Sequence, residues 1–381
     1  MTRRICVVTG SRAEYGTMKP VISAIDKDPR LELLLVVAGM HLVYECGMTV
    51  KQIKSDGFRV KSMIDMDITG ISLGDMARSI GLGIESMSEV YQRLKPDILL
   101  IAGDRIEALA AAITASYMKI VIVHYGGGQV SGSADNAARN AISKFAHIHL
   151  VKWPQHERRL LDLGESQGRI HLVGDIRYGR KGMVDIESRK SVLERYGIDS
   201  NRSVILIVFH PDTMDLDGSV DAAIELVGAV TKLNKQTVWL IPNADAGGKT
   251  ILELLKNRIM GSTAQVRLLT NVDQDEYFKL MKHSRLMIGN SSSIITEAPI
   301  FNLQSILIGK RQQGRERFDV IFEADGYEEK IVALAKRLLT DSKLRNKRYP
   351  KYKFYGDGQV AKKFVDILTN TKINENLLTK V

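Results

Sequence analysis

An acidic and a basic side chain follow a short apolar segment in the first half of the chain. Asp104 and Arg105 come directly after Ile98–Ala102, which Pro96 and Gly103 bound on either side. Such a segment is typical of a parallel strand buried on both faces, and open α/β sheets bind ligands beyond the carboxyl ends of their strands. A carboxylate there can transfer protons, and a guanidinium can bind an anion. An Asp that caps the next helix beside a surface Arg is the alternative, but the motifs below favour the chemical role.

A second candidate for anion binding is the stretch 9–16, Thr-Gly-Ser-Arg-Ala-Glu-Tyr-Gly, which directly follows apolar residues. A glycine turn that leads from a strand into a helix presents backbone N–H groups to an anion, and Arg12 adds positive charge. We expect the helix to begin near Thr17. The three-glycine spacing of a dinucleotide-binding turn is missing, so the stretch predicts phosphate binding without predicting a dinucleotide.

Hydroxyl side chains mark the second half of the chain. Ser292 and Ser293 belong to a run of three serines that follows the apolar segment Leu286–Gly289 and precedes a predicted helix. Hydroxyls at a helix start can hold phosphate oxygens with help from the helix dipole. Glu297, one turn further on, could accept hydrogen bonds from ribose hydroxyls. Serine capping is the alternative, but three consecutive serines exceed what one cap needs.

A basic loop follows the next predicted strand, residues 305–308. Lys310, Arg311 and Arg315 lie in this loop, which also contains Gly309 and Gly314. Two or three cations on a glycine-containing loop suit a diphosphate. Solvated surface charge explains the same residues equally well when the loop is considered alone.

The elements that would position these side chains alternate between strand and helix. In the first half we predict strands at 5–9, 31–38, 60–64, 98–102, 120–124, 149–152 and 170–173, and helices at 17–28, 79–94, 108–118, 135–147 and 155–163. Residues 174–180 break the pattern and are predicted to be a linker. The second half restarts it, with strands at 204–209, 237–241, 266–269, 286–289 and 305–308 and helices at 220–232, 250–259, 273–283 and 327–339.

Repeated strand–helix units of this length predict a doubly wound parallel sheet in each half. The expected fold class is α/β, with two Rossmann-like αβα domains facing each other across a cleft in a GT-B-like arrangement. We expect one domain at residues 1–174 and a second domain at residues 181–368. The final helix could return to the first domain.

Composition restricts the function classes. The 381 residues carry a formal charge of +10, but the basic residues are scattered and aromatic residues make up only 6%. A phosphate-bearing small ligand is therefore favoured over nucleic acid, which usually binds a basic stripe with stacking aromatics. The only cysteines, Cys6 and Cys46, exclude a disulfide framework and a cysteine-based zinc site. No apolar run reaches about 18 residues, and the first strand leaves no room for a signal peptide, so we expect a cytoplasmic protein without a membrane partner.

Taken together, the motifs resemble the hydrolysing UDP-N-acetylglucosamine 2-epimerases of sialic-acid-type sugar pathways. The resemblance covers nearly the whole chain and rests on an ordered set of residues: 9–16, 39–42, 103–105, 131–132 with Asp135 and Arg139, 141–144, 147–149, 210–211, 242–247, 290–293, 297–299, 311–312 with Arg315, and 355–358. The Arg-Ala-Glu-Tyr-Gly and Asn-Ser-Ser-Ser forms favour the hydrolysing branch over the non-hydrolysing one.

The resemblance implies a GT-B fold and a reaction at C2 of an N-acetylamino sugar nucleotide. It also implies that residues 1–174 form the sugar-binding and catalytic domain and that residues 181–368 form the nucleotide-binding domain. In the family, a base removes the C2 proton while the nucleotide leaves C1, and water then adds to the glycal with protonation from the opposite face. The products are UDP and a 2-epimeric free sugar such as N-acetylmannosamine. No metal or cofactor is implied, and we expect a homodimer or homotetramer.

Roles for individual residues follow from the same resemblance. It implies that Asp104 and Asp135 serve as catalytic groups near the sugar and that His210 stabilises charge on the leaving diphosphate. Substrate-binding roles are implied for a larger set: Arg12, Arg105, Arg139, Asn243, Ser292, Ser293, Glu297 and Arg311.

The chain departs from the family pattern at four positions. Gly126 and Gln129 stand where the family has glutamates, Asn136 stands in place of an acidic residue, and Asn140 stands in place of a histidine. Amide side chains still form hydrogen bonds, but they do not transfer protons near neutral pH. A GT-B glycosyltransferase or nucleotide-sugar hydrolase without C2 epimerisation is therefore a second hypothesis, and a non-catalytic sugar-nucleotide sensor is a third.

Overall fold

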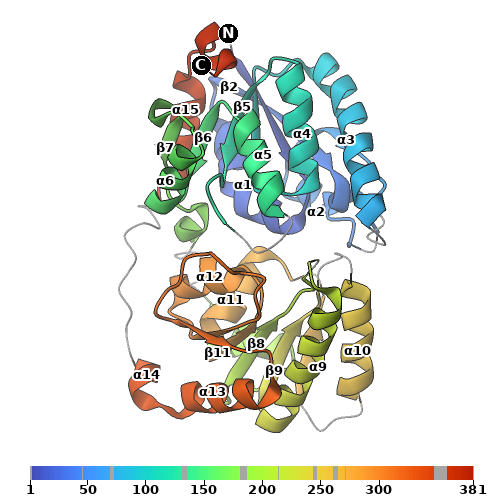
Figure 1. Cartoon of the computed structure of the whole chain (residues 1–381), viewed down its shortest axis with the longest axis vertical. Coiled ribbons are helices and arrows are strands. Elements are labelled where there is room, and N and C mark those ends of the chain that lie inside the picture. The colour runs from blue at the N-terminus through green and yellow to red at the C-terminus, as the bar shows by residue number, and fades with distance from the viewer. Residues whose placement is uncertain are drawn as a thin grey trace. The chain divides into compact units, whose positions relative to one another are not determined.

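The computed structural model describes residues 2–44, 46–68, 73–130, 135–180, 187–212, 214–242, 247–260, 265–270, 272–346 and 358–380. The chain divides into two compact units. Unit 1 contains residues 1–129, 134–180 and 352–381, and unit 2 contains residues 130–133 and 181–351. Each unit is built on its own parallel β-sheet with helices packed against it (Figure 1).

Unit 1 contains a seven-stranded sheet with the order β3-β2-β1-β4-β5-β6-β7. Its strands are β1 (Arg3–Thr9), β2 (Leu31–Ala38), β3 (Val60–Ile64), β4 (Ile98–Ala102), β5 (Val121–Tyr125), β6 (Ile148–Val151) and β7 (Ile170–Leu172). The chain runs outward from β1 to β3 and then returns to the other side of β1 at β4. The strand order therefore reverses between β1 and β4, which is where doubly wound folds bind their ligands.

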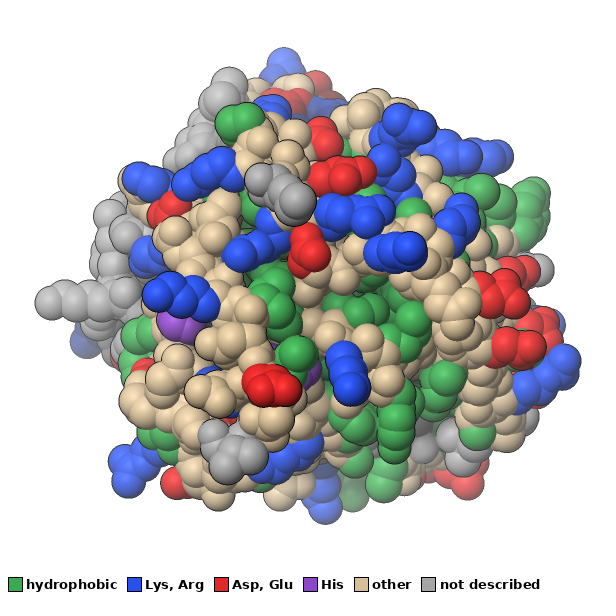
Figure 2. Space-filling view, turned by 90° about the horizontal axis from the view of Figure 1, so that it is seen from above, with side chains coloured by type: hydrophobic (Ala, Val, Ile, Leu, Met, Phe, Trp, Pro, Cys, Tyr) green, Lys and Arg blue, Asp and Glu red, His purple; other side chains and the backbone are tan. Residues whose placement is uncertain are grey.

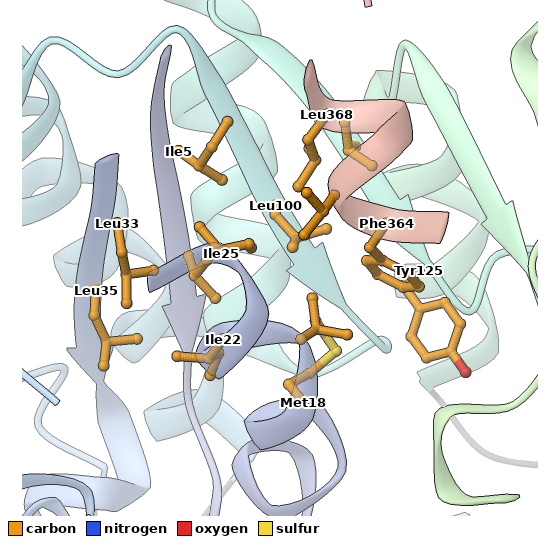
Figure 3. Close-up of a cluster of buried hydrophobic side chains, with 14 of the residues drawn as sticks. Ile5, Met18, Ile22, Ile25, Leu33, Leu35, Leu100, Tyr125, Phe364 and Leu368 are labelled. Carbon is orange, nitrogen blue, oxygen red and sulfur yellow. The ribbon is translucent and has the colours of Figure 1, made fainter. Parts of the chain in front are cut away.

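The helices of unit 1 cover both faces of this sheet. They are α1 (Arg12–Lys27), α2 (Val50–Ser55), α3 (Leu73–Leu94), α4 (Ile106–Tyr117), α5 (Asp135–Phe145), α6 (Pro154–Asp162), α15 (Val360–Asn370) and α16 (Glu375–Thr379), with 3₁₀ turns η1 (Gly39–Leu42), η2 (Gln167–Arg169) and η3 (Ile176–Arg180). Alternate strand residues point to opposite faces. Ile5 and Leu100 therefore pack with α1 and α15, as Figure 3 shows, whereas Cys6 and Leu99 pack with the residues of α3 and α4.

Unit 2 repeats the plan with six parallel strands in the order β10-β9-β8-β11-β12-β13. The strands are β8 (Val204–Val208), β9 (Gln236–Leu240), β10 (Val266–Leu269), β11 (Leu286–Gly289), β12 (Ser305–Ile308) and β13 (Ile321–Ala324). The helices are α8 (Arg189–Glu194), α9 (Leu216–Leu233), α10 (Gly248–Met260), α11 (Gln274–His283), α12 (Ser293–Thr296), α13 (Glu328–Thr340) and α14 (Ser342–Asn346), with the 3₁₀ turn η4 (Ala298–Phe301). Here the strand order reverses between β8 and β11.

Two predictions from the sequence are wrong. Helix α1 begins at Arg12 and not near Thr17, because the Ser11 hydroxyl accepts a hydrogen bond from the Glu14 N–H (3.4 Å) and caps the helix there. Residues 174–180 are not an open linker, because they include the 3₁₀ turn η3 and a buried ion pair between Asp175 and Arg177.

On the face shown in Figure 2, Lys and Arg side chains lie among Asp, Glu and uncharged side chains, and do not form one continuous stripe. Among the helices that the structure describes, none is both long and apolar enough to cross a membrane.

Candidate active site

The loops after β1 and β4 meet at the switch point of unit 1. The two strands pair in parallel, with Ile5 opposite Ile98, so their carboxyl ends lie at one edge of the sheet. Asp104 and Arg105 follow β4 directly, and α4 begins one residue later. Arg12 is the first residue of α1, just beyond β1. The backbone therefore brings Asp104, Arg105 and Arg12 to the same sheet edge.

Asp104 forms an ion pair with Arg139 of α5. The guanidinium of Arg139 is almost completely buried, and it also donates to the Gln129 carbonyl (3.1 Å) and to Oδ1 of Asn136 (3.2 Å). Arg139 is also a predicted substrate contact, and the structure places it against the carboxylate at the strand end. Two of the positions that depart from the family pattern, 129 and 136, thus supply hydrogen-bond acceptors to the counterion of Asp104. The other expected acid, Asp135, is the first residue of the same helix.

His124 of β5 supports the residue that precedes Asp104. Its Nε2 lies 2.8 Å from the Gly103 carbonyl oxygen, and its Nδ1 lies 3.2 Å from Oγ of Ser143. Burial lowers the pKa of His124 to about 3, so the imidazole is neutral at physiological pH. Nε2–H therefore donates to the carbonyl, and Nδ1 accepts from the serine hydroxyl.

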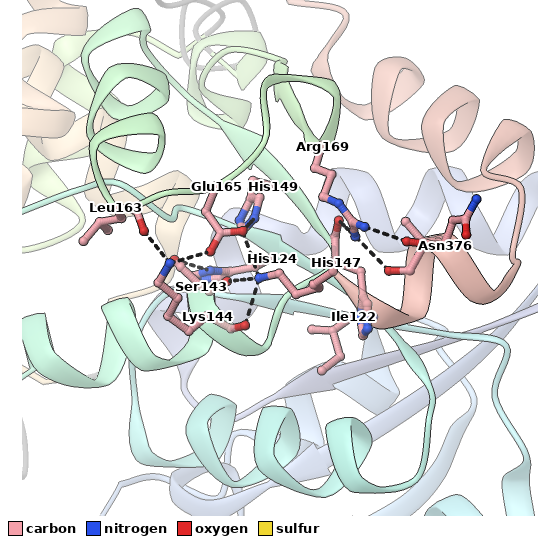
Figure 4. A network of polar contacts seen from close by, with 12 residues as sticks. Ile122, His124, Ser143, Lys144, His147, His149, Leu163, Glu165, Arg169 and Asn376 are labelled. Carbon is pink, nitrogen blue, oxygen red and sulfur yellow. Dashed lines mark hydrogen bonds and ion pairs between the residues drawn. The ribbon is translucent and has the colours of Figure 1, made fainter.

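A wider polar network surrounds this histidine, as Figure 4 shows. Glu165 accepts from Nε2 of His149 (2.9 Å) and pairs with Lys380 (2.8 Å). Burial alone would raise the pKa of Glu165, but the hydrogen bonds from His149 and Lys380 lower it to about 2. Arg169 donates to the carbonyl oxygens of Asn376 and Leu377, both at 2.7 Å. The C-terminal helix α16 is thereby held to the rest of unit 1 through polar as well as apolar contacts.

The turn after β5 needs its glycines for backbone reasons. Gly126 has φ +100°, and its carbonyl accepts a hydrogen bond from Nε2 of Gln129 (2.8 Å). Gly128 has φ +71°, and a Cβ there would lie 2.1 Å from the His156 carbonyl oxygen. L-residues with side chains rarely adopt such φ values. The glycine at position 126 therefore belongs to the geometry of the turn, and the amide of Gln129 closes it.

Two carboxylates that were not predicted as site residues lie at the same edge: Glu14 is half-buried and Glu107 is buried. Glu14 accepts from the Gly10 N–H (2.9 Å) and from the Thr9 hydroxyl (3.1 Å), and burial raises its pKa to about 8. Glu107 is buried and accepts from Nε of Arg105 at 3.3 Å. The spacing Ser11-x-x-Glu14 is a capping signal that could have located the first of them.

The serine-rich stretch of unit 2 follows β11. Ser292 precedes α12, and Ser293 is buried, where its hydroxyl accepts from the Tyr277 hydroxyl (2.6 Å) and donates to that of Ser291 (2.8 Å). Helix α12 contains four residues, so its dipole is smaller than a long helix would supply. Glu297 comes directly after α12, is buried, and accepts from the Thr296 hydroxyl at 2.9 Å.

The remaining predicted residues of unit 2 surround Asn290. His210 follows β8, and its backbone is bonded to the Asn290 side chain. Arg311, beyond β12, donates to the Asn290 carbonyl at 3.4 Å. The structure therefore brings His210, Arg311 and the serine stretch to one sheet edge. The predicted substrate contact Asn243 lies outside the described residues, as do 131–132, 244–246 and 355–357 of the motifs.

Within the described ranges, no group of three or more His, Cys, Asp and Glu side chains could hold a metal ion. The chemistry that these residues can perform is acid–base catalysis by carboxylates in unit 1 and anion binding by Arg311, backbone N–H groups and hydroxyls in unit 2.

Two Rossmann-like units, each with polar loops at its switch point, define an α/β protein of the GT-B class. The family model described as UDP-N-acetylglucosamine 2-epimerase matches residues 23–369, and the chain belongs to this family. It is an enzyme of the 2-epimerase type.

Curated relatives agree with this assignment. The chain is 33% identical to a UDP-N,N'-diacetylbacillosamine 2-epimerase (hydrolyzing) of Legionella pneumophila, over 100% of this chain and 99% of the relative. It is 32% identical to a UDP-N-acetylglucosamine 2-epimerase of Neisseria meningitidis, over 87% of this chain and 85% of the relative.

A solved structure supports the fold. The UDP-GlcNAc 2-epimerase of Neisseria meningitidis bound to UDP-GlcNAc superimposes with a TM-score of 0.82 at 18% identity, over 97% of this chain and 100% of that one.

Proposed function

We propose that this enzyme is a hydrolysing 2-epimerase that converts a UDP-linked N-acetylamino sugar into UDP and the free 2-epimeric sugar, such as N-acetylmannosamine. The observation that carries the proposal is the end-to-end similarity to a hydrolysing 2-epimerase, which spans 100% of this chain and 99% of the relative. The name of that relative includes both the inversion at C2 and the hydrolysis.

In the proposed reaction, the carboxylate of Asp104 accepts the proton from C2 of the sugar. The electrons of the C2–H bond form the C1–C2 double bond, while the C1–O bond breaks and the UDP oxygen takes its electron pair. Water then adds its oxygen to C1, and a proton reaches C2 from the opposite face. The guanidinium of Arg139 favours the ionised carboxylate because opposite charges in contact stabilise each other. Asp135 is the second carboxylate proposed to act near the sugar.

The proposed nucleotide site lies at the switch point of unit 2. His210 would stabilise the negative charge that develops on the leaving diphosphate. Polar groups that are already in place accelerate bond cleavage mainly by stabilising charge that develops in the transition state. Ser292, Ser293 and Arg311 would contact the diphosphate, and Glu297 would accept from the ribose. Arg12 and Arg105 of unit 1 are also proposed to bind the substrate through their positive charge.

Two relatives are named after different nucleotide sugars, and each of these sugars is a candidate substrate. One carries UDP-N,N'-diacetylbacillosamine in its name and another carries UDP-N-acetylglucosamine. The test is incubation of the purified protein with each nucleotide sugar, with UDP measured by chromatography and the free sugar identified by NMR. Release of UDP together with a sugar inverted at C2 supports the proposal, and no UDP release from either compound contradicts it.

Hydrolysis at C1 without inversion at C2 is the second candidate function. It is favoured by one observation, namely that Gly126, Gln129, Asn136 and Asn140 provide no side chain that transfers protons near neutral pH. In the same experiment, release of UDP together with a sugar of unchanged configuration at C2 would support this candidate over the first.

A further inference from the structure

Asn290 lies at the switch point of unit 2, between the loops that follow β8 and β11. Its side chain is buried, with an exposed fraction of 3%. Oδ1 accepts from the backbone N–H of His210 at 2.8 Å, and Nδ2 donates to the backbone carbonyl of His210 at 2.7 Å. The amide thus satisfies both main-chain groups of one residue, and this residue is the one proposed to act on the leaving diphosphate.

The backbone of Asn290 also forms hydrogen bonds with the end of β8 and with the loop after β12. Its N–H donates to the carbonyl oxygen of Val208, the last residue of β8, at 3.2 Å. Its carbonyl accepts from Nε2 of Gln312 at 3.0 Å and from Nη1 of Arg311 at 3.4 Å. One residue therefore joins the loops that follow β8, β11 and β12, three neighbouring strands of the sheet (Figure 1).

The close approach of these loops depends on the residue before Asn290. Gly289 has φ +149°, and a Cβ there would lie 2.0 Å from the Val208 carbonyl oxygen. Such contact excludes any side chain at position 289, so only glycine fits beside Val208 at the end of β8. Asn290 is then close enough to reach His210 with both amide atoms. An Asp side chain has the same shape but lacks the N–H that donates to the His210 carbonyl.

We propose that Asn290 is a positioning residue that fixes the His210 backbone and the Arg311 guanidinium relative to each other, so that both meet the diphosphate of a uridine nucleotide. The proposal rests on the proposed function, in which these two residues contact the nucleotide. Asn290 acts through them and is not expected to take part in proton transfer. Its loss removes the two hydrogen bonds that the amide makes with the His210 backbone.

The chain offers a matched control in Gln236, the first residue of β9. Its amide makes the same two-bond exchange with another backbone, since Oε1 accepts from the Asp199 N–H (2.9 Å) and Nε2 donates to the Asp199 carbonyl (3.0 Å). Gln236 is also buried, but it lies at the amino end of its strand, the edge opposite the ligand-binding one. Variants at position 236 therefore measure how much stability is lost when a buried amide away from the site loses its two hydrogen bonds to the backbone.

The experiment compares Asn290→Asp and Asn290→Ala with Gln236→Glu and Gln236→Ala in the full chain. UDP affinity is measured by calorimetry, UDP release from the nucleotide sugar by chromatography, and the melting temperature by scanning calorimetry. We expect both Asn290 variants to weaken UDP binding and slow UDP release by at least about tenfold, the scale of one lost buried hydrogen bond. The Gln236 variants should lower the melting temperature about as much as the Asn290 variants do, but their UDP affinity should stay at the wild-type value.

UDP affinity is the decisive readout because a purely structural role would lower stability without changing the dissociation constant of the folded protein. Asn290→Asp preserves the side-chain shape, so it gives an answer even where Asn290→Ala fails to fold. Wild-type UDP affinity in Asn290→Asp, or an equal loss of affinity in the Gln236 variants, would overturn the proposal. If the wild type binds UDP but releases none from the sugars, the proposed function falls while the affinity comparison still decides the role of Asn290.

Discussion

Asp104 and Arg139 form an ion pair, but the side chain of Asp104 is more exposed to solvent than that of Arg139. The side chain of Asp104 is 22% exposed, whereas that of Arg139 is 2% exposed. A guanidinium stays charged at any pH relevant to proteins, and the carboxylate of Asp104 supplies a counterion to this buried charge. Asp104 remains partly accessible at the end of β4, which is the condition for a carboxylate that must reach a substrate.

The substitution Asp104→Asn should separate the catalytic role from the structural one. The new amide would still offer an oxygen to Arg139, but it could not accept a proton, so we expect turnover to fall by about 10²–10⁴-fold, the usual contribution of an acid–base group. UDP affinity and the melting temperature should change little. Asp104→Ala is the matched comparison, because it leaves the Arg139 charge buried without this counterion and should lower the melting temperature clearly. Wild-type turnover in Asp104→Asn would remove Asp104 from the mechanism.

The glycine turn after β5 should not tolerate the glutamate of the family pattern. Gly126→Glu places a side chain at φ +100°, a conformation that costs about 1–3 kcal/mol for residues other than glycine. We therefore expect a lower melting temperature and no increase in hydrogen exchange at C2 of the sugar. Gln129→Glu, which leaves the glycine in place, controls for the added charge. Faster C2 exchange in Gly126→Glu would show instead that the missing carboxylate limits the rate.

Arg311→Ala should weaken UDP binding by roughly 1.5–3 kcal/mol, the range for hydrogen bonds to charged groups. The guanidinium lies beside Asn290 at the switch point of unit 2, where we place the diphosphate. Titration calorimetry with UDP measures the change, and Arg317→Ala, which removes an arginine paired with Glu323, serves as the control. Equal affinities in wild type and Arg311→Ala would move the phosphate site elsewhere.

His124 should make unit 1 less stable as the pH falls. Its pKa is about 3 in the folded protein and about 6.5 when the chain is unfolded, so below pH 6.5 the unfolded state binds a proton that the folded state does not. The stabilisation is complete above pH 6.5 and is lost as the pH falls towards 3, by up to about 1.4 kcal/mol per pH unit.

The variant His124→Gln removes this titration. Its melting temperature should therefore fall less than that of the wild type between pH 7 and pH 5. Ser143→Ala is the control, because it removes the hydroxyl that bonds Nδ1 but leaves the titrating imidazole in place. An identical pH dependence in wild type and His124→Gln would contradict the prediction, because it would show that the pKa of His124 is the same in the folded and the unfolded protein.

The sequence predicted the sheets well because buried parallel strands are short apolar runs with clear boundaries. β2, β4 and β11, for example, have the predicted ends. β13 was not predicted, since its four residues include Glu323 and none of them is fully buried. The early start of α1 was missed because Gly16 was interpreted as the end of a turn, whereas it lies inside the helix and is buried.

Side-chain partnerships in the site were beyond the reach of sequence patterns. The positions of Asp104, Arg105 and Arg12 at one sheet edge follow from the strand order alone. Arg139 packs against Asp104, which lies 35 positions away in the chain. Asn290 is bonded to His210, which lies 80 positions away. Pairs so distant in the chain depend on tertiary packing, which no local pattern encodes.

The most direct test of the proposed function is turnover of the nucleotide sugars in deuterated water. Wild-type protein is incubated with UDP-N-acetylglucosamine and, separately, with UDP-N,N'-diacetylbacillosamine, and the released sugar is examined by NMR and mass spectrometry. The proposal predicts UDP release with one deuterium at C2 and inverted configuration there, because the C2 proton is removed and replaced from solvent. UDP release with the original hydrogen and configuration at C2 would contradict it and would establish hydrolysis at C1 alone.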